Sequence, residues 1–233
     1  MSEYNAEDVR NVALVGHAGA GKTTLVEALL AAAGAIKEPG SVDRGTAVCD
    51  WDDMEKELKH SLDVGITGFT THGKHINLLD TPGYPDFLGR ALSVLSAVET
   101  TAIVVNAENG IEPLTQRMWK AADKRNHCRM FIVNRIDADG LDLDALTAQI
   151  REAFGAECLP INLPADGGKR VIDCFFNPSG GGADFSSVEE AHSQIIDQVV
   201  EVDEDLMERY LEQGQALKPE QLHDAFEEAL REA

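Results

Sequence analysis

One short segment limits the possible folds of this chain more than any other. Residues 16–23 read Gly-His-Ala-Gly-Ala-Gly-Lys-Thr and match the pattern G-x-x-x-x-G-K-[ST]. The segment follows the apolar run 11–15 and precedes the helix-forming run 24–33, so it lies where a strand leads into a helix. Glycines in such a loop let backbone N–H groups close around phosphate oxygens at the positive end of the helix dipole. We therefore expect a nucleotide-binding fold that begins with this strand, loop and helix.

The phosphate loop also assigns roles to its own residues. Lys22 should reach the outer phosphates, and the Thr23 hydroxyl should bind Mg²⁺. The motif alone does not name the base, because ATP-dependent P-loop enzymes such as kinases and partition ATPases share it. The complete set of expected phosphate-binding residues is His17, Ala18, Gly19, Ala20, Gly21, Lys22, Thr23 and Thr24.

Strand and helix patterns alternate beyond this loop. Short apolar runs indicate strands, and longer runs with helical periodicity indicate helices. The alternation predicts a mostly parallel sheet with helices on both faces. The expected elements are a hairpin of strands 64–70 and 76–79 turning near His72 and Gly73, a helix 86–98, a strand 101–106, a helix 112–124, a strand 130–134 and a helix 142–154.

The chain changes character after Cys158. A Pro- and Gly-rich stretch that includes 177–182 leads into two acidic helical patterns, 187–213 and 219–233. Acidic residues far outnumber basic ones from residue 184 onward. This excess indicates either a solvated helix face or a docking surface for a basic protein.

A second motif, Asp80-Thr81-Pro82-Gly83, ends the apolar run 76–79. It places a carboxylate at the tip of a strand and a glycine just behind it. Asp80 is therefore expected in the magnesium shell, and Gly83 is expected to contact the γ-phosphate as a hinge that senses it. A simple Pro-Gly turn is the alternative interpretation of the isolated tetrapeptide.

A third motif follows the strand 130–134. Asn134-Arg135-Ile136-Asp137 resembles the N-K-x-D base-reading motif of GTPases, with Arg135 in place of lysine. The Asp137 carboxylate accepts both the ring N–H and the exocyclic amine of guanine, and adenine offers no such pair of donors. Asn134, Arg135 and Asp137 are thus the expected base-binding residues, and their presence disfavours an ATP enzyme.

The composition excludes some classes of binding partner. A formal net charge of -21 argues against a broad surface for nucleic acid or anionic membrane, because such binding depends on Lys and Arg. The four cysteines lie far apart and form no C-x-x-C pair, which favours reduced thiols in the cytosol. No apolar run approaches the ~20 residues that span a bilayer. We expect a cytoplasmic protein with no membrane partner.

Three blocks resemble elongation factor G. They are Asp50–Ser61, Asp80–Phe87 and the string Asp203–Leu211, similar to the first switch, the second switch and the insert subdomain of that family. The resemblance extends from about Arg10 to the end of the sequence and is strongest in the last string, which other small GTPases lack. It implies a Ras-like α/β fold with an inserted α/β subdomain, and it places a GTP-binding core at 1–157 and the insert subdomain at 158–233.

The resemblance also implies an activity. A family member binds GTP and GDP with Mg²⁺, hydrolyses GTP and acts at the ribosome through its full-length chain; hydrolysis by an isolated domain should be slow. Ser61 would join Thr23 and Asp80 as a metal ligand. Lys22, Gly83 and Tyr84 would act in catalysis.

Several positions depart from the family pattern. Gly19 stands where the phosphate loop usually has Asp, Leu58-Lys59-His60-Ser61 replaces Arg-Gly-Ile-Thr, and Arg135 replaces Lys. Tyr84 stands where a histidine would position the attacking water. At these positions the sequence resembles elongation factor G-like paralogues rather than the housekeeping factor. His60 could supply an imidazole instead, although a surface-exposed histidine with no catalytic part is the expectation.

Two alternative functions remain open. Tyr84 favours a guanine-nucleotide switch that does not hydrolyse GTP. A ribosomal protection protein or a release-factor GTPase would share every motif in this sequence. Finally, the family continues into a strand and a loop that contacts the guanine oxygen, so we expect this chain to be a fragment and to bind guanine nucleotide more weakly than a longer one.

Overall fold

The computed structural model describes residues 4–201, 206–207 and 226. The chain forms two compact units, Met1–Asn134 and Arg135–Ala233. The domain boundary predicted from the sequence lies after residue 157. It rests on composition and resemblance, whereas the division into two units rests on compactness, so the predicted boundary stays a prediction.

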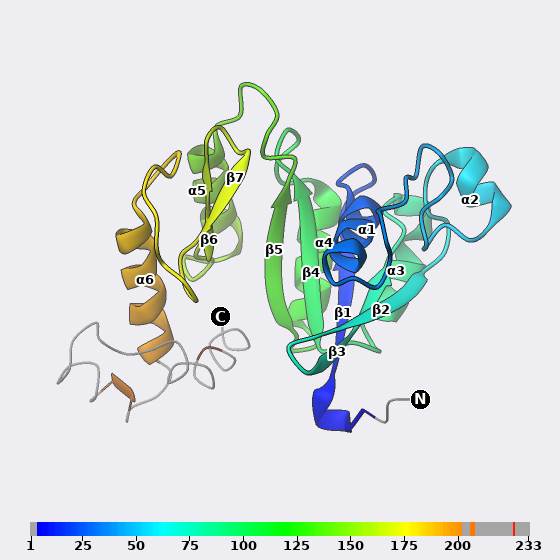
Figure 1. The fold of residues 1–233 in the computed structure, drawn as a ribbon, viewed down its shortest axis with the longest axis horizontal. Helices are drawn as coiled ribbons and strands as arrows, with labels where there is room; N and C mark the ends of the chain where they lie inside the picture. Colours follow the sequence, from blue (N-terminus) through cyan, green and yellow to red (C-terminus); the bar gives the residue numbers. More distant parts are fainter. Residues whose placement is uncertain (1–3, 202–205, 208–225, 227–233) are drawn as a thin grey trace. The chain divides into compact units, whose positions relative to one another are not determined.

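The first unit is built on a five-stranded sheet (Figure 1). The strand order is β2-β3-β1-β4-β5, in which β1 runs parallel to β3 and β4, and β4 runs parallel to β5. Only β2 pairs in the antiparallel sense, with β3. The strands are β1 (Val9–Val15), β2 (Gly65–Thr71), β3 (Lys74–Asp80), β4 (Thr100–Asn106) and β5 (Cys128–Asn134). The predicted mostly parallel sheet is confirmed.

From residue 4 onward, four α-helices and two short 3₁₀ turns complete this unit. The helices are α1 (Lys22–Ala32), α2 (Asp53–Leu58), α3 (Leu88–Val94) and α4 (Pro113–Asp123), and the turns are Ala6–Asp8 and Pro85–Phe87. The predicted helix 86–98 is wrong in extent, because Pro85 opens a 3₁₀ turn and α3 ends at Val94. The sequence did not anticipate α2, whose six residues are too few for a helical period to stand out.

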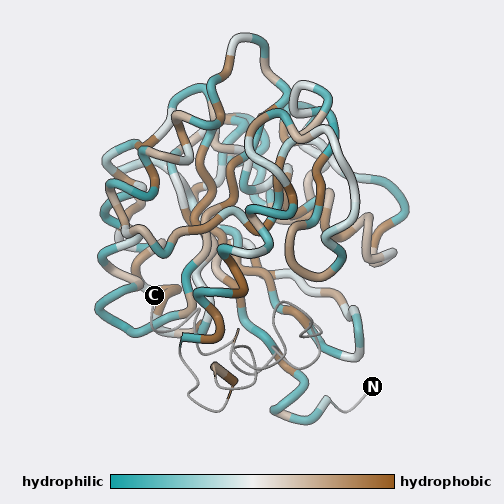
Figure 2. Tube along the Cα trace, turned by 90° about the vertical axis from the view of Figure 1, so that its left-hand side faces the viewer, coloured by the Kyte–Doolittle hydropathy of each residue, from teal (hydrophilic) through white to brown (hydrophobic). Residues whose placement is uncertain are grey.

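The two faces of the sheet bury separate clusters. Alternate residues of β1 point to opposite faces, as the pleat requires. Leu14 packs in a cluster with α1, whereas Ala13 and Val15 pack in a cluster with α3 and α4. Figure 1 shows α1 in front of the sheet and α3 and α4 behind it, and Figure 2 shows hydrophobic stretches of chain running through the interior. Helices on both faces were predicted, and this is confirmed.

The β2–β3 hairpin turns where the sequence predicted. Its register runs from Gly65 opposite Asp80 to Thr71 opposite Lys74. The two turn residues, His72 and Gly73, both have positive φ, 47° and 76°. A two-residue turn of this kind matches the twist of the flanking strands.

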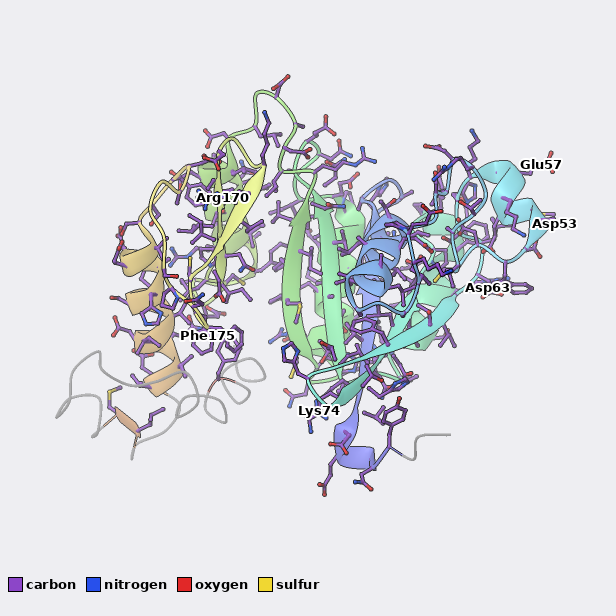
Figure 3. All side chains as sticks on the ribbon, in the orientation of Figure 1. Asp53, Glu57, Asp63, Lys74, Arg170 and Phe175 are labelled. Carbon is purple, nitrogen blue, oxygen red and sulfur yellow. The ribbon has the colours of Figure 1, made fainter. Side chains whose placement is uncertain are left out.

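The described part of the second unit up to residue 201 contains two helices and a two-stranded sheet. Its elements are α5 (Leu143–Phe154), β6 (Asn162–Ala165), β7 (Arg170–Asp173) and α6 (Val188–Val200), with β6 and β7 antiparallel. The core of this unit includes Leu163, Phe175 and Ile195, and Phe175 is one of the side chains labelled in Figure 3. The expected α/β subdomain is consistent with these elements.

Parts of the predicted acidic helices lie outside the described residues. The first, 187–213, is seen as α6, which ends at Val200. Ser187 caps it by accepting a hydrogen bond from the Glu190 N–H at 3.0 Å. The second, 219–233, lies outside the described residues except for residue 226. None of the helices in the described part of the chain has the length and apolar character that crossing a bilayer requires.

Candidate nucleotide and magnesium site

The phosphate loop connects the carboxyl end of β1 to the first turn of α1. Its first and last glycines are required by close packing. A Cβ at Gly16 would lie 2.3 Å from the Val104 carbonyl oxygen, and a Cβ at Gly21 would lie 2.3 Å from Asn134 Nδ2. Both also have positive φ, 144° and 91°. The loop is thus fixed between β4, β5 and the N-terminus of α1, where backbone N–H groups favour an anion.

Lys22 lies inside this loop. Its side chain is buried, and the ammonium donates to the carbonyl oxygens of Gly16 at 2.9 Å and His17 at 3.0 Å. Burial lowers the pKa of Lys22, and the carboxylates of Asp80 and Glu112 partly offset the effect. The cation is therefore held at the loop by backbone acceptors, with two acids nearby.

The other predicted phosphate-binding residues line the same turn. Ala20 N–H donates to His17 O at 3.2 Å, and the His17 imidazole contacts Glu112, the N-cap residue of α4, at 3.1 Å. Gly19 is exposed with φ 78°, and Thr24 is exposed on α1. Residues 17–21 therefore form the loop and residues 22–24 begin α1, as the motif predicts, and their roles stay predictions.

The three predicted metal ligands, Thr23, Ser61 and Asp80, lie close together. The Thr23 hydroxyl donates to Asp80 Oδ2 at 2.6 Å, and Ser61 Oγ lies 3.4 Å from Thr23 Oγ1. A fourth residue, Asp50, joins them and accepts a hydrogen bond from Ser61 Oγ at 3.5 Å. Asp50 was not among the predicted metal ligands, although it falls inside the block that resembles the first switch.

Two oxygens of this cluster fit a hard cation. Among the described residues, the buried oxygens Asp50 Oδ2 and Asp80 Oδ1 have no hydrogen-bond partner. Burial raises the pKa of Asp80 to about 6, against the opposing effects of Thr23 and Lys22. Burial also raises the pKa of Asp50, helped by Glu55. Mg²⁺ prefers such oxygens and uses few protein ligands, and its charge would offset the burial of two carboxylates.

The second switch segment touches the phosphate loop through its backbone. Thr81 anchors the segment, because its hydroxyl donates to Leu14 O at 2.8 Å. Gly83 O accepts from the Ala18 N–H at 3.0 Å. A Cβ at Gly83 would lie 2.5 Å from Lys22 Nζ, so only glycine allows this approach. Gly83 therefore contacts the phosphate loop, and its role as a hinge next to the terminal phosphate stays a prediction.

Tyr84 follows Gly83 and contacts His60 of the first switch segment. The ring centroids are 4.5 Å apart, with the planes inclined at 55°. Tyr84 is 41% exposed, whereas His60 is only partly exposed. The expectation that His60 is a surface-exposed histidine is met only in part, because its ring is partly buried and lies against the Tyr84 ring. The expectation that it has no catalytic part stays a prediction.

Two buried glutamates hold the chain on either side of the first switch segment. Glu27 of α1 accepts from the N–H groups of Gly40 at 2.7 Å and Val48 at 2.5 Å. Glu55 of α2 accepts from the N–H groups of Leu62 at 2.8 Å and Asp63 at 3.1 Å. Neither glutamate was predicted. For Glu27 the sequence did contain a signal, because an acid within the apolar run of α1 indicates a buried carboxylate. Charged carboxylates that accept backbone N–H groups make strong hydrogen bonds and order irregular chain.

The base-reading motif is divided between the two units. Asn134 ends β5, and its amide donates to Ala20 O at 2.9 Å, which brings it to the phosphate loop. Arg135, with φ 60°, and Asp137 belong to the second unit. Their role in reading guanine stays a prediction from the sequence.

Comparison with known proteins gives consistent matches. Residues 7–228 match the family model described as the elongation factor Tu GTP binding domain. The chain is 37% identical over 216 residues to an elongation factor G-like protein of Mycobacterium tuberculosis, covering 87% of this chain and 30% of that protein. It is 32% identical over 236 residues to elongation factor G of Fervidobacterium nodosum, covering 94% of this chain and 34% of that protein.

A solved structure agrees with these relatives. A crystal structure of a protein from Thermus thermophilus superposes with a TM-score of 0.83 at 37% identity, over 95% of this chain and 36% of the other. The chain thus spans about a third of the length of the proteins that it matches.

Proposed function

The chain belongs to the family of elongation factor Tu GTP-binding domains, and from this premise we propose that it binds GTP and GDP with Mg²⁺ and slowly hydrolyses GTP. One observation carries the proposal. Lys22, Thr23, Ser61, Asp80 and Gly83 come from separate segments and meet at the carboxyl edge of β1 and β3. In open sheets of this kind the carboxyl edge is the usual place for a ligand.

The binding step follows from the charges at this edge. The phosphate loop would offer its N–H groups to the nucleotide phosphates, and the buried Lys22 ammonium would exchange its carbonyl partners for phosphate oxygens. Asp137 would select guanine by accepting from two donors of the base. Within the first unit, Asn134 joins β5 to the phosphate loop.

Thr23, Ser61 and Asp80 would hold Mg²⁺, and Asp50 lies close enough to assist through water. When bound, Mg²⁺ would supply positive charge that offsets the negative charge of the nucleotide phosphates. The unpartnered oxygens of Asp50 and Asp80 support this assignment. Lys22 would supply a second positive charge from within the phosphate loop.

Hydrolysis would rely on positioning and charge rather than on a covalent intermediate. Lys22 would stabilise negative charge that develops on the phosphates, Gly83 would contact the γ-phosphate through its backbone, and Tyr84 would contact the attacking water. A neutral phenol offers no positive charge at pH 7, which supports a slow intrinsic rate. In the full-length protein we expect this activity in the cytoplasm, at the ribosome, by analogy with the elongation factor G relatives.

A second candidate is a guanine-nucleotide switch without hydrolysis. Tyr84 favours it, because the phenol replaces a group that could carry positive charge. Single-turnover GTP hydrolysis separates the two functions. A ribosomal protection protein or a release-factor GTPase would share this site, and assays of the full-length protein on ribosomes would distinguish these roles.

Nucleotide binding to the wild-type chain and to Lys22→Ala tests the proposal. We expect GTP and GDP to bind in the presence of Mg²⁺ and ATP to compete poorly. Loss of a charged hydrogen-bonding group costs roughly 1.5 to 3 kcal/mol, so Lys22→Ala should bind GTP about 10- to 150-fold more weakly by calorimetry. Equal GTP affinity in the two proteins would show that the glycine-rich loop is only a turn. Lys124→Ala, on the C-cap of α4, is the matched control.

A further inference from the structure

Two rings from distant segments of the first unit meet beside the phosphate loop. His60 follows α2 and Tyr84 follows β3, and their ring centroids are 4.5 Å apart. The His60 ring also lies 6.5 Å from that of Phe87. Tyr84 immediately precedes the 3₁₀ turn Pro85–Phe87, and Phe87 ends it. The imidazole therefore packs against both ends of this turn.

The backbone on both sides of His60 is fixed by one residue, Glu55. Lys59 ends α2 in the left-handed conformation with φ 56°, and His60 N–H donates to the Glu55 carbonyl at 3.3 Å. The buried Glu55 carboxylate then accepts from the N–H groups of Leu62 and Asp63. A segment held at both ends in this way gives the His60 side chain a defined direction.

Residues next to the two rings touch the phosphate loop. Ser61, which follows His60, has its Oγ 3.4 Å from Thr23 Oγ1. Gly83, which precedes Tyr84, accepts from the Ala18 N–H. The two rings are thus each one residue away from a contact with the phosphate loop. Their meeting point lies at the rim of the proposed GTP site.

The Tyr84 ring needs a partner to hold its direction. It is 41% exposed, and among the described residues its hydroxyl makes no hydrogen bond and its ring contacts no aromatic ring other than His60. A tyrosine side chain turns about two torsions, and an adjacent ring removes part of that freedom. A phenol hydroxyl both donates and accepts, so its direction decides whether it can hold a water molecule.

From this geometry we propose that His60 is a positioning residue for Tyr84: the imidazole of the first switch segment holds the phenol of the second so that its hydroxyl orients the attacking water. The role rests on the proposed GTP hydrolysis. It depends on ring contact and not on the charge of the imidazole. It assigns a function to a histidine that the motifs leave without one.

The chain contains a matched control for this contact. Tyr4 and His75 form a second phenol–imidazole pair, with centroids 4.3 Å apart, and His75 lies at the opposite end of β3 from Asp80. His75→Ala removes the same chemical contact away from the phosphate loop. Its effect measures what losing such a pair does to the fold alone.

The experiment measures single-turnover GTP hydrolysis and GDP affinity for the wild type, His60→Ala, His60→Phe, Tyr84→Phe, the double variant His60→Ala/Tyr84→Phe, and His75→Ala. His60→Ala should hydrolyse GTP about tenfold to a hundredfold more slowly, since a small misplacement of a reacting group has effects of this size. Its GDP affinity should stay within about twofold of the wild type, because a positioning role affects the rate and not the binding.

The other variants separate ring contact from other causes. His60→Phe should keep most of the rate because it keeps a planar ring, and Tyr84→Phe should lose about as much as His60→Ala. The double variant should be no slower than the slower single variant, because both changes remove the same contribution. His75→Ala should match the wild type.

Three results would overturn the assignment. These are an unchanged rate in His60→Ala, an equally large loss in His60→Phe, and additive losses in the double variant. Any of them, with hydrolysis by the wild type intact, leaves the proposed GTPase activity standing. Absence of GTP hydrolysis by the wild type would instead overturn the proposed activity and, with it, the role of His60.

Discussion

At the scale of single residues, Asp80 has opposite effects on stability and on binding. It is 1% exposed, and burial raises its pKa from the ordinary 3.8 to about 6. Above pH 6 the folded protein therefore holds a carboxylate that would be better solvated in the unfolded chain. The shift of about 2 pH units corresponds to about 3 kcal/mol that the fold loses at neutral pH without Mg²⁺.

Asp80→Asn should consequently stabilise the chain when Mg²⁺ and nucleotide are removed. We expect the free energy of unfolding to rise by about 1 to 3 kcal/mol at pH 7. The gain stays below the full cost of the buried charge, because the amide makes a weaker bond with Thr23 and no longer offsets the charge of Lys22. The folded wild type takes up a proton as the pH falls through 6, so its stability recovers there. The difference between the two proteins should shrink by about 1.4 kcal/mol between pH 7 and pH 5.

Urea denaturation in the presence of EDTA at the two pH values measures this difference. A difference that is the same at pH 5 and pH 7 would show that the carboxyl does not titrate in this range. With Mg²⁺ present the same variant should bind GTP more weakly than the wild type, because one of the three proposed metal ligands is changed.

Asp137 carries the prediction for base selection. Asp137→Asn replaces a double acceptor with a group that has one carbonyl, and a guanine donor is left poorly matched. GDP affinity should fall about 10- to 150-fold, which corresponds to roughly 1.5 to 3 kcal/mol. Calorimetry with GDP and with xanthosine diphosphate tests this, since xanthine offers an acceptor where guanine has its amine. Wild-type affinity for GDP in Asp137→Asn would remove Asp137 from the base site.

At the scale of elements, α2 acts as a clamp for the chain that follows it. Asp52 and Glu55 form a capping box at its start, and the buried Glu55 carboxylate also accepts from Leu62 and Asp63. Asp53 and Glu57 of the same helix are exposed, and Figure 3 shows them on its outer side. The helix thus has one acid that holds the fold together and others that face solvent.

Glu55→Ala should loosen this segment locally. Each N–H left without an acceptor costs about 1 to 3 kcal/mol when it stays buried, so the segment should open to find water instead. Amide hydrogen exchange at Leu62 and Asp63 should become faster by at least about tenfold, whereas exchange in β1 should not change. Glu57→Ala is the control on the same helix. Equal protection of Leu62 in the two variants would contradict the clamp.

A feature of the fold or the site could be predicted from the sequence when the residues that determine it lie close together in the chain. The phosphate loop, Asp80 and Asn134 belong to contiguous motifs, and the strand-ending positions of β1, β3 and β5 bring them to one edge of the sheet. Their neighbourhood could therefore be predicted from strand order alone. Ser61 was found only through resemblance, because a lone serine in an irregular segment carries no pattern.

The missed features depend on contacts between segments. Asp50, Glu55 and the pairing of His60 with Tyr84 involve residues outside any repeating period, and their roles follow from which loops meet. The extent of α3 was missed because a proline at the start of a helical pattern permits either a helix or a 3₁₀ turn.

At the scale of the whole molecule, ligand binding and folding are linked. A ligand that binds only the folded chain stabilises it by about 2.7 kcal/mol at a free concentration of 100 times its Kd. GDP with Mg²⁺ at that concentration should therefore raise the midpoint of chemical unfolding, and EDTA should remove much of the gain. ATP at the same concentration should have little effect. Equal stabilisation by ATP and GDP would contradict guanine selectivity.

The contact between Gly83 and the phosphate loop limits how this site can evolve. Any side chain at residue 83 would collide with Lys22 Nζ and with the Ala18 nitrogen, whatever its chemical nature. Residue 84 has more room, because its side chain is 41% exposed and its ring contact within the described residues is with His60 of the first switch segment. We therefore expect glycine at residue 83 in all relatives and different side chains at residue 84. A substitution at 84 should be accompanied by a change at residue 60, whose ring it contacts. The catalytic chemistry of relatives can then differ at 84 while residue 83 stays the same.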